Sequence, residues 1–239
     1  MVEIYDDSGK LVQSIPASNR KGLNKVYWNQ RMKPPKTATG GSKVDYGGFI
    51  APMVLPGKYT VKLKAGSKEL SSSVVMQHDD KNPNFSKEDR QLQYKTAMDI
   101  YRLHESLAKV VDDISGRQKQ LKKYMDSTSN KKLKVTLQEY YDQLEALRAN
   151  CLATKMKSVF ADEERIRERI TDLYMAVAMQ ESAPSNLQLQ RVGVLKGEVD
   201  GAAQSNEAIV AKYDAKVKAA LIKEGLLKDD KPKVENKKL

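Results

Sequence analysis

The sequence is poor in the residues that most often carry chemistry. Its one cysteine, Cys151, excludes a disulfide within the chain. Its two histidines, His78 and His104, are too few for an ordinary zinc site. No apolar run reaches the ~18 residues of a membrane span, and the first residues lack the basic and apolar regions of a signal peptide. The sequence therefore predicts no catalytic residue, no metal site, no cofactor and no membrane span.

Charge is abundant but not concentrated. The 42 basic and 31 acidic residues leave a net charge of +11. Residues 1–85 hold 13 basic and 7 acidic residues, and residues 86–239 hold 29 and 24, so the excess is shared. A stripe for specific nucleic-acid binding would be more concentrated, and none is expected. Electrostatic binding to an acidic polymer stays open as one possible function.

The first third of the chain has the two-residue period of β-strands. Apolar and polar residues alternate over 58–64 and again over 24–31, where Val26 and Trp28 share a face. Two strands are expected around the Asp6–Gly9 turn, and another over 70–76. This pattern predicts a small β-sandwich of immunoglobulin or fibronectin type over residues 1–80. The Gly-, Pro- and Lys-rich segment 33–49 has no period and is expected to be a long exposed loop.

After a linker at 81–85, the period becomes that of helices. Ser86 with Asp89 resembles an N-cap, and apolar residues then recur at heptad spacing to Tyr124, with Arg117 interrupting them. A second stripe, from Leu133 to Cys151, has steps of three and four residues. Two further helices follow, the last beginning near Ser185. A multidomain β + α chain is expected, with an elongated antiparallel helical bundle over 86–225 and a disordered basic tail over 226–239.

Few residues are candidates for a site. Trp28 and Cys151 are expected in the cores. Paired carboxylates such as Asp112–Asp113 are adjacent in sequence and cannot face each other across a cleft as a glycosidase pair must. Stacking on a sugar needs exposed aromatic rings, and the candidates for a carbohydrate-binding surface are Tyr27, Tyr46 and Phe49.

Three strings carry a resemblance to a known family: GLNKVYWNQR at 22–31, APMVLPGKYTVKL at 51–63 and SSSVVMQHD at 71–79. They resemble the C-terminal β-sandwich module of large secreted Bacteroidetes-type proteins with BNR or sortilin-like propellers, labelled glycosyl-hydrolase-like or exo-sialidase-like. The strings FADEERIRERI at 160–170 and SAPSNLQ at 182–188 resemble the helical segment that follows that module. The propeller motifs are absent. The resemblance implies a C-terminal part of a larger exported protein, periplasmic, outer-membrane-associated or extracellular, whose catalytic part lies outside this chain.

Three functions follow, in order of preference. The first is a non-catalytic accessory and structural module that docks on the propeller of its parent or forms a homodimer through the helices. The second is a carbohydrate-binding module with a glycan as partner. The third is electrostatic binding to an acidic polymer, whose affinity would fall steeply with salt.

Overall fold

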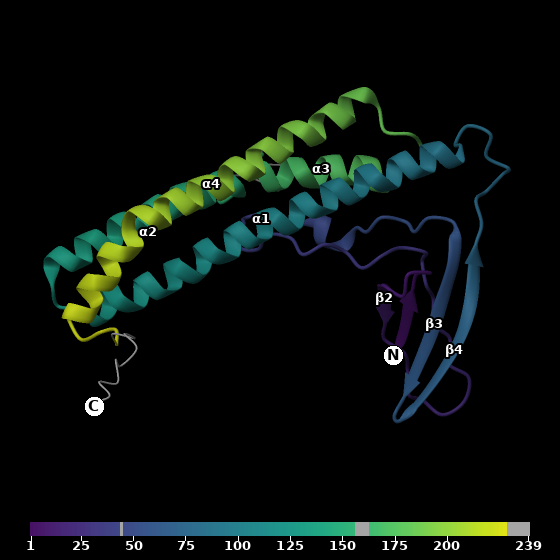
Figure 1. Ribbon diagram of the computed structural model, residues 1–239, viewed down its shortest axis with the longest axis horizontal. Coiled ribbons are helices and arrows are strands. Elements are labelled where there is room, and N and C mark those ends of the chain that lie inside the picture. The colour runs from purple at the N-terminus through teal and green to yellow at the C-terminus, as the bar shows by residue number, and fades with distance from the viewer. Residues whose placement is uncertain (44, 156–162, 229–239) are drawn as a thin grey trace, which may run out of the picture.

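The computed structural model describes residues 1–43, 45–155 and 163–228. It has a small four-stranded antiparallel sheet followed by four helices (Figure 1). The elements, in chain order, are β1 (Val2–Tyr5), β2 (Leu11–Ile15), the 3-10 helix η1 (Tyr46–Phe49), β3 (Gly57–Ala65), β4 (Lys68–Met76), α1 (Lys87–Ser127), α2 (Lys131–Cys151), α3 (Ile166–Ala178) and α4 (Asn186–Lys223). No helix of the described residues has the length and apolar character to cross a membrane.

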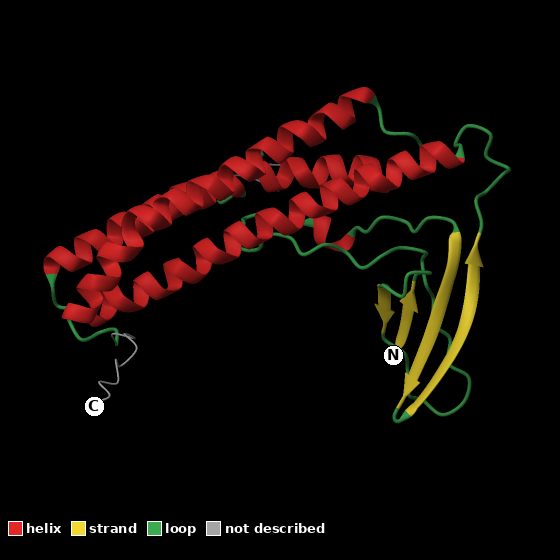
Figure 2. Ribbon diagram, viewed as in Figure 1, coloured by secondary structure: helices red, strands yellow, loops and turns green. Residues whose placement is uncertain are grey.

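The sheet has the strand order β2-β1-β3-β4. The expected turn between β1 and β2 is confirmed, because Asp6 Oδ1 accepts hydrogen bonds from the backbone of Ser8 and Lys10, and Gly9 has a φ of +79°. One face carries a core of four buried side chains, Ile4, Val12, Val54 and Tyr59. The strands run across the long direction of the helices, beside one end of them (Figure 2).

A sandwich requires two sheets, and the described residues form only one. The strand predicted over 24–31 is wrong: this segment is irregular apart from an isolated bridge between Arg31 and Met53. Gln30 has a φ of +61°, and the Trp28 indole donates to the Arg31 carbonyl at 3.0 Å. The segment therefore covers the sheet as a loop. Trp28 is expected inside the core, but it is only half-buried and packs edge-on against Tyr59 at the margin of the sheet core.

The helical expectations hold more closely. Ser86 and Asp89 form a capping box at the start of α1, and Ser185 and Gln188 form one at α4. The six residues of the second stripe are the buried residues of α2. In Figure 1, α2 and α3 lie nearly end to end and run opposite to α1 and α4. The prediction of a disordered tail over 226–239 is wrong at its start, because Leu226 and Leu227 pack against the helical core. Residues 229–239 lie outside the described residues.

The segment 33–49 is not an exposed loop, and this prediction is also wrong. Within it, Ala38 is 1% exposed and belongs to the core of the helical part; Ile50, directly after the segment, is 9% exposed and belongs to the same core. The segment packs along the helices, where Arg148 and the buried Arg167 donate hydrogen bonds to its carbonyl groups.

Candidate functional site

The three predicted sugar-binding aromatics are exposed but do not share one element. Tyr46 and Phe49 lie three residues apart on η1, and their exposed fractions are 59% and 79%. Tyr27 is 74% exposed and lies in the irregular segment before the Arg31–Met53 bridge, with the Lys25 ammonium 4.7 Å from its ring centre. The structure thus brings two of the three candidates together.

One segment contributes to both hydrophobic cores. Residues 31–54, here called the strap, leave the sheet, run along the helices and return to the sheet. Met32 and Val54 pack in the sheet core, whereas Ala38 and Ile50 pack in the helical core. A single stretch of chain therefore links two cores that the sequence predicted to be separate.

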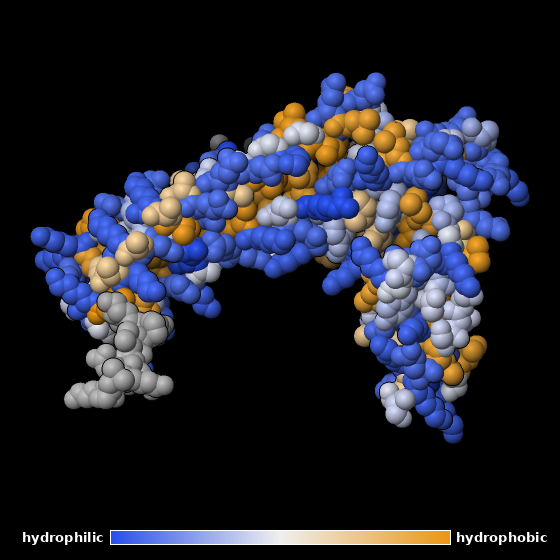
Figure 3. Space-filling model, viewed as in Figure 1, coloured by the Kyte–Doolittle hydropathy of each residue, from blue (hydrophilic) through white to orange (hydrophobic). Residues whose placement is uncertain are grey.

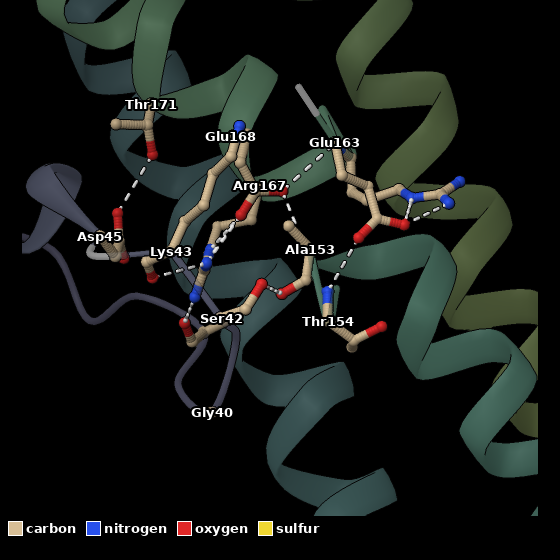
Figure 4. Close-up of polar contacts among 12 residues, drawn as sticks. Gly40, Ser42, Lys43, Asp45, Ala153, Thr154, Glu163, Arg167, Glu168 and Thr171 are labelled. Atoms are coloured by element: carbon tan, nitrogen blue, oxygen red, sulfur yellow. Dashed lines mark hydrogen bonds and ion pairs between the residues drawn. The ribbon is translucent and has the colours of Figure 1, made fainter. Parts of the chain in front are cut away.

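The middle of the strap is held by Arg167 of α3. This side chain is buried and donates to the carbonyl oxygens of Ala38 at 3.1 Å and Lys43 at 3.2 Å. Its charge is balanced by Glu168, with a closest nitrogen–oxygen distance of 2.7 Å. Glu168 also accepts from the Ala153 backbone N–H at 3.1 Å, so the ion pair ties together the strap, α3 and the end of α2 (Figure 4). A buried arginine paired in this way satisfies backbone oxygens that would otherwise lack partners.

The strap comes very close to the helices at Gly41. A β-carbon there would lie 2.5 Å from Arg167 Nη2 and 2.9 Å from the Ala153 carbonyl oxygen, so only glycine fits without rearrangement. The next residue, Ser42, donates its backbone N–H to the same Ala153 oxygen at 2.8 Å. Arg148 of α2 donates to the Gly40 carbonyl. Arg148, Arg167 and Glu168 are together called the strap clamp.

A second buried polar group holds η1. Asp45 caps this helix by accepting from Gly47 N–H, and the same oxygen accepts from the Thr171 hydroxyl at 3.1 Å. Gly47 packs on His104 of α1, where a β-carbon would come within 2.7 Å of the imidazole ring. Tyr46 and Phe49 project outward on a turn whose inner side is fixed.

His104 is held in its neutral form. It is 1% exposed, and neither ring nitrogen has a hydrogen-bond partner among the described residues. Burial lowers the pKa of His104 to about 4, against the opposing effect of the Asp45 charge and with a smaller contribution from Arg167. Its ring packs edge-on against Tyr174 at 5.4 Å, so it behaves as a core residue.

A second cluster, here called the junction, fastens both ends of the strap to the helices. Arg90 of α1 is buried and donates to the Val54 carbonyl at 2.9 Å and to Gln93 at 2.5 Å. Gln93 donates to the Val177 carbonyl at 2.9 Å. Arg31 donates to the carbonyl oxygens of Ala51 at 2.7 Å and Ala178 at 3.0 Å. Burial lowers the pKa of Arg90. The junction therefore joins the sheet core directly to α1 and α3.

Sequence reasoning missed both clusters, although a signal was present. Arg90, Gln93 and His104 lie on the same face of α1 as the buried Ala97 and Ile100. Polar residues on an apolar helix face mark either a buried polar network or a site. Without the strap, nothing in the heptad pattern indicates which backbone oxygens they bind.

The central residues of these clusters are closed to solvent. Arg167, Glu168 and His104 are less than 9% exposed, so a substrate does not reach them. Burial raises the pKa of the Cys151 thiol to about 11, which leaves it protonated and a poor nucleophile. Among the residues that the structure describes, no group of three or more potential ligands is arranged to hold a metal ion.

The far end of the helices has an open groove of about 530 Å³, lined by apolar residues of α1 and α4 and by Arg117, Tyr140 and Asp214. Arg117 bridges Asp113 and Asp214, each at 2.8 Å. Tyr140 donates to Asp214, and burial with this bond raises its pKa to about 12. The polar groups of the groove bind one another across α1, α2 and α4, which explains the charged interruption of the first heptad stripe.

Comparisons with family models, with curated proteins and with solved structures found no match for this chain.

Proposed function

We propose that this chain is a non-catalytic accessory and structural module, whose elongated antiparallel bundle carries the sheet in a fixed position and offers both to a larger partner. The observation that supports this proposal is the strap, which belongs to both cores and is fastened at the junction and at the strap clamp. Buried arginines on backbone oxygens resist sliding of one part over the other, because each displaced bond would leave a buried charge without a partner.

The partner in this proposal is the propeller of a larger exported protein, as the family resemblance implies. That part of the proposal rests on the sequence strings at 22–31, 51–63 and 71–79. The helices supply a long surface, and the sheet projects from one end of it (Figure 3). Such a shape suits a spacer that contacts its partner at two separate places.

The test is an assay of the purified chain on aryl glycosides and sialosides. We expect no turnover, because the buried polar clusters are closed to a substrate and serve as clamps. Turnover that disappears when an Asp or Glu of this chain is changed would contradict the non-catalytic assignment.

A carbohydrate-binding module is the second candidate, and the geometry of η1 favours it. Tyr46 and Phe49 are exposed on a turn whose inner side is fixed by Asp45, Thr171 and His104. Rings held in place before binding lose little entropy when a sugar stacks on them.

A glycan array tests this candidate. Binding should survive added salt and be lost in the Tyr46→Ala/Phe49→Ala variant, while Tyr27→Ala, which removes an equally exposed ring elsewhere, leaves it unchanged. If the affinity falls steeply with salt and is unchanged when Tyr27, Tyr46 or Phe49 is replaced, the partner is an acidic polymer instead.

A further inference from the structure

The sheet ends in a strand whose outer edge is open. β4 pairs with β3 over nine consecutive residues without a bulge. No described residue outside β3 bonds to its backbone. In Figure 1, β4 is the outermost strand, on the side of the sheet away from the α1–α2 turn. Its outer N–H and C=O groups are therefore available to another strand.

Edge strands usually carry features that prevent such pairing, namely charges, proline, bulges or short length. β4 has none of them over Leu70–Met76, where the sequence is LSSSVVM. Leu70 is 67% exposed on one face and Val75 is 62% exposed on the other. Separate apolar patches are visible among the more polar surface on the outer side of the β3–β4 hairpin (Figure 3). This edge has the properties of a site for strand addition.

The opposite edge of the sheet is already occupied. Lys33 of the strap donates its backbone N–H to the Val12 carbonyl of β2 at 2.9 Å, and the Gln13 side chain donates to the Met32 carbonyl at 3.2 Å. A second copy of this chain can therefore not offer β2 to β4, which excludes head-to-tail growth of a continuous sheet. It can offer its own β4, and such a pair closes on itself.

We propose that two copies of this chain pair antiparallel through β4 and form one continuous eight-stranded sheet. The best register is centred on Ser73. It places Leu70 opposite Met76 of the second copy, an apolar pair on one face of the sheet, and Val75 opposite Ser71 on the other face. Glu69 then faces Gln77, and no like charges oppose one another.

Sedimentation of the full chain across micromolar to submillimolar concentrations tests the pairing, together with hydrogen exchange at low and high concentration. We expect a monomer–dimer equilibrium and slower exchange of amides within residues 70–76 at high concentration. The Leu70→Lys/Val75→Lys variant should weaken the dimer at least about tenfold, because charged side chains block edge pairing.

The Val135→Lys/Leu187→Lys variant is the matched control. It makes the same two changes at residues on α2 and α4 that are 58% and 75% exposed, so the added charge is equal. We expect it to dimerise like the unchanged chain. Three results would each overturn the proposal. The chain could be monomeric at every concentration, only the control variant could weaken the dimer, or the exchange rates of amides 70–76 could be independent of concentration. The circular dichroism spectra of both variants should match that of the unchanged chain, which would show that a weaker dimer does not result from misfolding.

Discussion

The two hydrophobic cores of this protein differ greatly in size. Among the described residues, the helical core buries 29 apolar side chains, two of them from the strap, whereas the sheet core buries four. A four-stranded sheet with so small a core gains little hydrophobic free energy to offset the conformational entropy that its residues lose on folding. The helical core is far larger, and the helices themselves supply most of its residues. The difference indicates that the sheet is held in place largely by its attachment to the helices at the junction and the strap clamp.

The strap clamp should show the largest effect of a single substitution. Arg167→Ala leaves Glu168 buried without its partner and removes the donors to Ala38 and Lys43. The free energy of unfolding should fall by about 3–5 kcal/mol, as for other broken buried ion pairs. Urea unfolding measures it. Arg102→Ala is the control, because Arg102 pairs with Asp99 at the surface and its loss should cost within about 0.5 kcal/mol. Equal effects of the two variants would mean that the clamp does not hold the fold.

The helical core should respond to a cavity as any packed core does. Leu144 is completely buried in the second stripe, and Leu144→Ala should cost about 2–5 kcal/mol. Gln138→Ala on the exposed face of the same helix should cost within about 0.5 kcal/mol. Thermal unfolding of both variants provides the comparison. Unchanged stability of Leu144→Ala would show that this stripe is a docking surface and not a core.

Lowering the pH should reduce the stability of the fold through His104, the residue of α1 against which Gly47 of η1 packs. The pKa of His104 is lowered from 6.5 to about 4 in the folded chain. Between pH 6.5 and pH 4 the unfolded chain therefore binds a proton at this histidine, whereas the folded chain does not. Stability from this residue is complete above pH 6.5 and is lost as the pH falls toward 4, by up to about 3 kcal/mol. Urea unfolding at a series of pH values should show this slope, and His104→Gln should remove its share of it. A slope that persists in His104→Gln would assign it to the carboxylates instead.

A pair of glycine substitutions compares a close contact with an open surface. Gly41→Ala forces a methyl group against Arg167 and Ala153, and should destabilise by about 1–3 kcal/mol. Gly197→Ala on α4 meets no atom within 4 Å and should stabilise by up to about 1 kcal/mol, because alanine favours the helix. The melting temperatures of the two variants should move in opposite directions. A stabilised Gly41→Ala would show that the strap does not approach α3 so closely.

The sequence predicts local features of this fold better than it predicts how the parts meet. The caps at Ser86 and Ser185 and the stripe from Leu133 to Cys151 were predictable because each depends on residues within a few turns. The strap was mistaken for an exposed loop because its partners, Arg148 and Arg167, are more than 100 residues away in sequence. The alternation at 24–31 indicated a strand, but Gln30 turns the chain and Trp28 folds onto Tyr59. The exposure of Tyr46 and Phe49 was expected, whereas the buried groups that position them were not.

The dependence of the sheet on the helices is tested most directly at Arg90, which binds the carbonyl of Val54 in the sheet core from α1. Hydrogen exchange of the full chain compares Arg90→Ala with the unchanged protein at amides of β3 and of α2. We predict that β3 protection falls at least about tenfold while α2 protection is retained, because the sheet loses its anchor and the helical core does not. Unchanged protection of β3 in this variant would contradict the account, since it would show that four buried side chains suffice to hold the sheet.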